Sequence, residues 1–100
     1  MRLTPVQVHS ITETVSRFAG GTAEVFLFGS RLDDRAKGGD VDLLIETSGP
    51  LALVERAWIK MELESRLGLP VDLVSHVRDS ASTPLQRIAR AHAFKLEARS

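Results

Sequence analysis

Three aspartates carry the most informative chemistry in this chain of 100 residues. Asp40 and Asp42 are two residues apart at the start of a predicted strand, so they share one face of a sheet at one end. Asp72 stands near the start of a later predicted strand. Three like charges gathered at one place repel one another unless a cation is present. Carboxylate ligands favour a hard ion, so the pattern predicts a site for Mg²⁺, with Mn²⁺ as the other candidate.

Gly29 and Ser30 supply the second half of this pattern, because they follow a short apolar strand and precede a predicted short helix. Glycine lets the backbone approach a ligand closely, and a helix N-terminus offers free N–H groups to an anion. The Ser30 hydroxyl adds a donor, and Arg31 is either a phosphate contact or a solvated first-turn arginine. The predicted ligand is a phosphate, and two metal ions about 3.5 to 4 Å apart would assist in-line displacement of pyrophosphate.

Seven elements are predicted to position these residues. Thr4-Pro5 begins a first helix that ends near Phe18, and Thr83-Pro84 repeats this start for a last helix that runs nearly to the end. Hydrophobic patterning predicts the others: strands over 24–28, 41–46 and 71–74, a short helix within 31–39 and a helix over 51–67. The sequence therefore predicts one α/β domain over residues 1–100, in the order α-β-α-β-α-β-α, with a mixed three-stranded sheet and about four helices.

The connections predict how the strands pair. The short link between the first two strands favours antiparallel neighbours, which brings Gly29 and Ser30 beside Asp40 and Asp42. The helix over 51–67 acts as a right-handed crossover, so the third strand is expected to lie parallel to the second. Asp72 then arrives at the same end of the sheet as the other two aspartates.

Apolar stripes predict which helix faces are buried, and two histidines and one phenylalanine need separate interpretation. His76 follows Asp72 by four residues and is a candidate neighbour of the site, whereas His92 fits a packed core histidine. Phe94 lies off the last helix's stripe and is a candidate partner contact. The predicted stripes are Val8, Ile11, Val15 and Phe18 in the first helix, Val54, Ala57, Trp58 and Met61 in the crossover helix, and Leu85, Ile88, Ala89, His92 and Leu96 in the last.

Composition restricts the possible partners. Thirteen basic residues balance thirteen acidic ones, which argues against a general electrostatic grip on nucleic acid or an anionic membrane. The chain has no cysteine, which excludes disulfides and suits a cytoplasmic location. Its longest apolar runs, Val25–Phe28 and Leu51–Val54, are far shorter than the roughly 20 residues that span a bilayer. A domain of this size buries only about 60 to 65% of its unfolded surface, so a protein partner would add stability.

Three segments together resemble the minimal nucleotidyltransferases of the DNA polymerase β superfamily. They are Leu27-Phe28-Gly29-Ser30-Arg31, Gly39-Asp40-Val41-Asp42-Leu43-Leu44-Ile45 and Val71-Asp72-Leu73-Val74. The resemblance implies the nucleotidyltransferase fold and transfer of a nucleotide from an NTP, expected to be ATP, with two Mg²⁺ ions. It implies that Asp40 and Asp42 bind metal and that Asp72 binds the second metal and helps activate an acceptor hydroxyl. Gly29, Ser30 and Arg31 would hold the triphosphate.

The resemblance also implies a partner. Small members of this family are often antitoxins paired with a helical HEPN toxin, and some transfer AMP to a tyrosine of that toxin, which implies a hetero-oligomer. Nine residues separate Ser30 from Asp40, one fewer than is common in the family, and Asp33 and Asp34 stand where many members carry a basic residue and a glycine. Both departures bear on nucleotide affinity. Two other functions stay open: a catalytically weak or silent module that neutralises its partner by contact, and nucleotide transfer to a small molecule.

Overall fold

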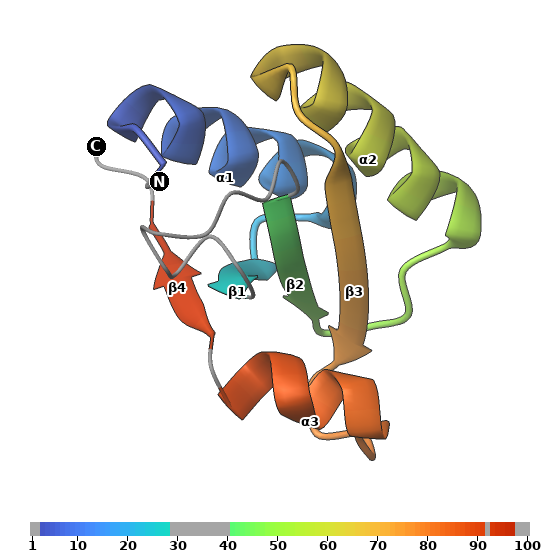
Figure 1. Cartoon of the computed structure of the whole chain (residues 1–100). Helices are drawn as coiled ribbons and strands as arrows, with labels where there is room; N and C mark the ends of the chain where they lie inside the picture. The colour runs from blue at the N-terminus through green and yellow to red at the C-terminus, as the bar shows by residue number, and fades with distance from the viewer. Residues whose placement is uncertain (1–2, 29–40, 92, 98–100) are drawn as a thin grey trace.

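The computed structural model describes residues 3–28, 41–91 and 93–97 (Figure 1). The helices and strands alternate along much of the chain, and a short strand follows the last helix. In chain order they are α1 (Pro5–Ala19), β1 (Glu24–Phe28), β2 (Val41–Thr47), α2 (Leu53–Leu67), β3 (Val71–Val77), α3 (Pro84–Ala91) and β4 (Phe94–Leu96).

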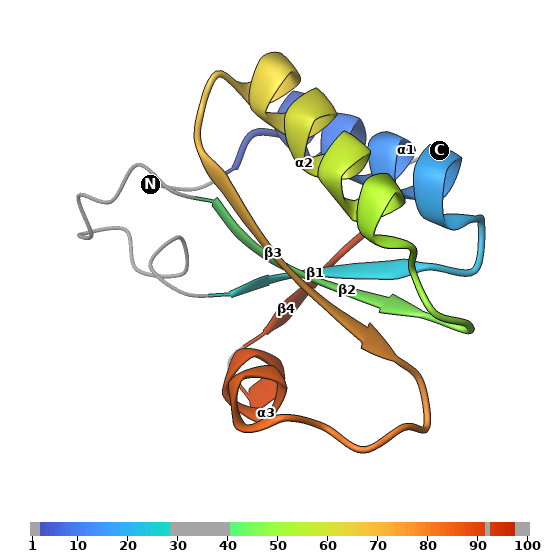
Figure 2. The same ribbon diagram turned by 90° about the vertical axis from the view of Figure 1, so that its right-hand side faces the viewer.

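The four strands form one sheet in the order β3-β2-β1-β4. β1 is antiparallel to both β2 and β4, whereas β2 and β3 are parallel. The predicted pairings of the first three strands are therefore confirmed. α1 and α2 lie side by side on one face of the sheet, and α3 lies on the other (Figure 2).

The two Thr-Pro sequences begin α1 and α3 as predicted, and both use the same cap. Thr4 Oγ1 accepts a hydrogen bond from the Gln7 N–H at 3.1 Å, while Gln7 Oε1 accepts one from the Thr4 N–H at 2.8 Å. Thr83 and Gln86 make the equivalent pair of hydrogen bonds, also at 3.1 and 2.8 Å. These reciprocal bonds satisfy N–H groups that a helix start otherwise leaves unpaired.

Two apolar clusters hold the layers together, one on each face of the sheet. The cluster under α1 and α2 is the larger and includes Ile11, Val15, Leu43, Ile59 and Leu63. The cluster under α3 consists of Phe26, Leu44 and Ala89, with Phe28, Val74 and Ala93 packed against it. No helix in the described part of the chain is long and apolar enough to cross a membrane.

The prediction for the last helix was wrong at its C-terminal end. α3 stops at Ala91, and Phe94–Leu96 forms a fourth strand on the free edge of β1. Leu96 packs in the α1–α2 cluster through this strand, because pairing with Val25 places it on that face of the sheet. The short helix predicted within 31–39, and His92, lie outside the described residues.

The predicted buried face of α2 was also wrong, and that of α3 was right within the helix only at Ala89. α2 buries Ile59 and Leu63, whereas Trp58 is 50% and Met61 67% exposed. In α3 only Ala89 is buried, and Leu85 and Ile88 are 57% and 63% exposed. α2 packs against both α1 and β3, and this double contact selects a different stripe from the one that the sequence suggested.

Candidate active site

Asp42 and Asp72 lie directly opposite each other at the starts of β2 and β3. They are register partners in the parallel pair, and Asp42 also pairs with Phe28, the last residue of β1. Alternation along the strands places both carboxylates on the face that α3 partly covers, since Phe28, Leu44 and Val74 on the same face pack in its cluster. The predicted meeting of Asp42 and Asp72 at one sheet end is confirmed.

The other predicted site residues are Gly29, Ser30, Arg31 and Asp40, and all four lie outside the described residues. Their attachment to the fold is nonetheless defined by the chain itself. Residue 29 follows Phe28 directly, and residue 40 directly precedes Val41. Because Phe28 pairs with Asp42, both attachment points belong to the sheet end that carries the two carboxylates.

This donor set is chemically suited to a hard divalent cation. Two carboxylates on adjacent parallel strands present oxygen ligands side by side, the ligand type that Mg²⁺ and Mn²⁺ take in proteins. Among the described residues no cluster of three or more metal-ligating side chains is found. The third predicted ligand, Asp40, precedes this part of the structure by one residue.

A groove of about 330 Å³ adjoins Asp72 on the outer side of β3. Its polar lining includes two cations from α2, Arg56 and Lys60, which the sequence motifs did not identify. Lys60 is held in place, because its Nζ donates to Glu64 at 3.2 Å and to the Val71 carbonyl. The two cations are four residues apart on α2, which puts them on one face of the helix. This spacing was the only feature of the sequence that could have pointed to them. The lining residues are Leu53, Arg56, Ala57, Lys60, Asp72 and Leu73.

His76 lies toward the opposite end of the sheet from Asp42 and Asp72, so this candidate is not a neighbour of the site. Its Nδ1 is 3.1 Å from Glu46 Oε2, and its Nε2 is 3.2 Å from Ser82 Oγ. Glu46 pairs in register with both His76 and Glu24, which aligns the three side chains in a row across the strands. Four residues along an extended strand span about 13 Å, so the small sequence separation from Asp72 does not bring His76 to the site.

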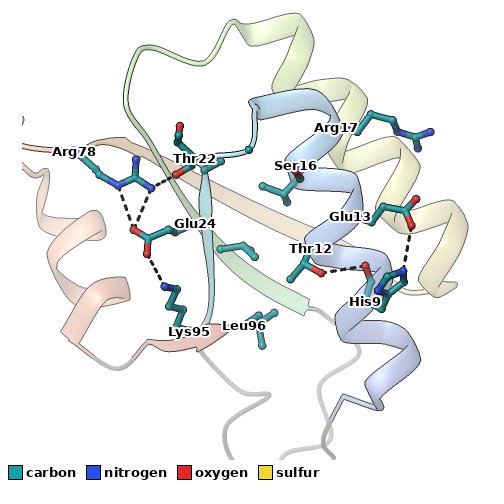
Figure 3. Close-up of a pocket in the computed structure, with 14 residues that line it drawn as sticks. His9, Thr12, Glu13, Ser16, Arg17, Thr22, Glu24, Arg78, Lys95 and Leu96 are labelled. Atoms are coloured by element: carbon teal, nitrogen blue, oxygen red, sulfur yellow. Dashed lines mark hydrogen bonds and ion pairs between the residues drawn. The ribbon is translucent and has the colours of Figure 1, made fainter. Parts of the chain in front are cut away.

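A second cavity, of about 870 Å³, lies between α1, the start of β1 and β4 (Figure 3). Most of its charged side chains bind one another: Glu24 accepts from Arg78 at 3.1 Å and from Lys95 at 2.7 Å, and His9 is 3.3 Å from Glu13. Although this cavity is larger, it contains neither Asp42 nor Asp72. The cavity of larger volume therefore does not coincide with the predicted site.

The Glu24 ion pairs predict a pH dependence of stability. The hydrogen bond from Lys95, aided by Arg78, lowers the pKa of Glu24 below its usual value of 4.5, although burial opposes the shift. A carboxyl with a depressed folded pKa stabilises the fold above its unfolded pKa, and this contribution is lost as the pH falls through the folded value.

Glu24→Gln is therefore expected to flatten the loss of stability below about pH 4.5, measured by urea unfolding at several pH values. Asp79→Asn serves as the control, since it removes one exposed carboxylate that forms no ion pair within the described residues. Equal acid sensitivity of Glu24→Gln and the unmodified chain would contradict the assignment.

Comparison with known proteins now defines the class. A mixed four-stranded sheet with helices on both faces and carboxylates at one end is consistent with a nucleotidyltransferase fold. The model of the family described as "Nucleotidyltransferase domain" matches residues 8–96, and the chain belongs to this family. No match was found among curated protein sequences.

Solved structures support the same fold. A tri-AMPylated HEPN toxin in complex with its MNT antitoxin, from Shewanella oneidensis, contains a chain of 23% identity with a TM-score of 0.72, over 94% of this chain and 71% of that one. A structure of a mutant MntA–HpeT toxin–antitoxin pair contains a chain of 22% identity with a TM-score of 0.71, over 97% of this chain and 75% of that one. A minimal nucleotidyltransferase has 24% identity and a TM-score of 0.67, over 89% of this chain and 88% of that one. At these identities the likeness establishes the fold.

Proposed function

We propose that this nucleotidyltransferase transfers AMP from ATP to a tyrosine hydroxyl of a HEPN toxin and thereby acts as its antitoxin. The observation that carries the proposal is the register pairing of Asp42 with Asp72 at the sheet end where residues 29 and 40 attach. This pairing puts two carboxylates side by side at one end of the sheet, which supports the proposal.

In the proposed reaction the acceptor oxygen forms a bond to the α-phosphorus of ATP, and the bond from that phosphorus to the pyrophosphate oxygen breaks. Asp72 accepts the proton of the acceptor hydroxyl, which makes the oxygen a better nucleophile. Gly29, Ser30 and Arg31 hold the triphosphate. Asp40, Asp42 and Asp72 would bind Mg²⁺, which when bound neutralises phosphate charge and supports the departure of pyrophosphate.

The partner is inferred from the proteins whose solved structures share this fold. The structural neighbours include an AMPylated HEPN toxin bound to an MNT antitoxin and a further toxin–antitoxin pair. We therefore place the chain in a hetero-oligomer with its toxin.

Nucleotide binding is the first consequence to measure. Isothermal titration of the chain with ATP and MgCl₂ is expected to show binding that Asp40→Ala combined with Asp42→Ala abolishes. Removing both carboxylates leaves the triphosphate without its cation, and its charge is then uncompensated at an acidic sheet end. EDTA added to the unmodified chain is expected to have the same effect.

An unmodified chain that binds no NTP would contradict the catalytic proposal and favour the second candidate, a silent module that neutralises the toxin by contact. That candidate draws support from the exposed apolar side chains on α2 and α3, Trp58, Met61, Leu85 and Ile88. In that case the double variant would still neutralise the toxin.

A further inference from the structure

The outer edge of β3 is the starting point, because β3 is an edge strand with β2 on one side only. Successive residues of a strand direct their backbone N–H and C=O groups to alternate edges. Even-numbered positions face β2: the Val41 N–H donates to the Pro70 carbonyl, and the Arg78 N–H donates to the Thr47 carbonyl. Odd-numbered positions of β3 therefore face outward.

Side chains from two helices cover this edge at both ends. At Val71 the N–H donates to Glu64 at 2.9 Å, and the carbonyl accepts from Lys60. At Ser75 the carbonyl accepts from Gln86 Nε2 at 2.8 Å. Between these covered positions, the N–H and C=O of Leu73 and the N–H of Ser75 have no partner within the described residues. These three groups can pair with an added strand.

This open length of edge forms one wall of the groove beside Asp72. Leu73 and Asp72 belong to the groove, and the opposite wall is the α2 face that carries Leu53, Arg56 and Lys60. Figure 2 views the sheet from this edge, with α2 above β3. A ligand in the groove therefore lies along the strand and within reach of Asp72.

The charge of the groove selects the ligand. Lys60 is paired with Glu64 at 3.2 Å, whereas the exposed Arg56 side chain makes no ion pair with any described residue. An extended peptide with an acidic side chain would pair with Arg56 and place an apolar side chain against the exposed Leu53. The groove therefore fits an acidic extended peptide better than a basic one.

We propose that the groove binds the acceptor segment of the protein partner as an added strand along Leu73, with an acidic side chain at Arg56 and the acceptor hydroxyl at Asp72. The hydroxyl's role rests on the proposed function. Arg56 is a specificity-determining residue in this arrangement.

The test uses three synthetic heptapeptides with a central Tyr and no nucleotide present. One carries Glu on both sides of the Tyr, the second carries Lys there, and the third is the Glu peptide with N-methylated backbone amides. In ¹H–¹⁵N NMR titrations the Glu peptide is expected to shift the Leu73 and Ser75 amides and to bind about fivefold more tightly than the Lys peptide. The N-methylated peptide is expected to bind no better than the Lys peptide.

Arg56→Glu is expected to reverse the preference, so that the Lys peptide binds more tightly. Arg87→Glu on α3 makes the same charge change on the other side of the sheet and should preserve the original order. Equal binding of the Glu and Lys peptides, an unchanged preference in Arg56→Glu, or shifts that spare Leu73 would overturn the inference.

Binding is measured without ATP, so the result is separate from catalysis. Peptide binding at Leu73 together with a chain that never transfers AMP would refute the proposed function and leave the groove assignment standing. If Arg56→Glu transferred AMP to the toxin at an unaltered rate and no peptide shifted the Leu73 amide, the groove assignment alone would be refuted.

Discussion

Asp72→Asn is expected to lower the rate of nucleotide transfer to the toxin by at least about a hundredfold, the size of a lost general base. ATP binding with Mg²⁺ should survive, because Asp40 and Asp42 remain. The amide has nearly the same shape as the carboxylate, and position 72 is exposed, so the fold should be unaffected. The measurement is a single-turnover assay that follows AMP incorporation into the toxin by intact mass.

Asp79→Asn is the matched control for this variant. It makes the same chemical change at an exposed turn after β3, where the positive φ of 64° is one that asparagine tolerates. Its transfer rate should equal that of the unmodified chain. If Asp72→Asn transferred nucleotide at a similar rate, Asp72 would have no role in the reaction.

Leu63→Ala is expected to destabilise the fold by about 2 to 5 kcal/mol, because it deletes a fully buried side chain and leaves a cavity. Met61→Ala, two residues away on the same helix, should cost less than about 1 kcal/mol, since Met61 is mostly exposed. Urea unfolding followed by circular dichroism gives both free energies. The opposite order would mean that α2 packs through the stripe that the sequence suggested.

The pairing of Asp42 with Asp72 was predictable because connection geometry decides it. A parallel neighbour needs a crossover, and the helix before Asp72 supplies one, while Gly and Pro mark where the strands begin and end. Such rules depend on element order and length, which one sequence displays directly. The same reasoning gave the antiparallel pairing of β1 with β2, and the structure agrees.

The buried face of α2 was not predictable from the same information. The helix carries two apolar sets, one with Trp58 and Met61 and the other with Ile59 and Leu63. Both have helical spacing, so only the packing of α2 against α1 and β3 decides between them. The first set is left exposed, which is unusual for a Trp.

β4 was not predicted from the sequence, for a related reason. A strand of three residues is too short to show alternation, and Leu96 stands seven positions after Ala89, where it extends a helical stripe. Its burial arises instead from pairing with β1, a contact between residues about 70 positions apart. The groove at Arg56 could likewise not be predicted from the sequence, because it depends on how α2 lies over the edge of β3.

The central claim is that this chain transfers AMP to a toxin, and intact-mass spectrometry of the toxin tests it most directly. The HEPN protein is to be sought in the neighbouring reading frame, purified, and incubated with this chain, ATP and MgCl₂. The account predicts added mass in steps of one AMP, absent with Asp42→Asn and restored by the unmodified chain. Neutralisation of the toxin with no added mass, under conditions where ATP binds, would contradict it.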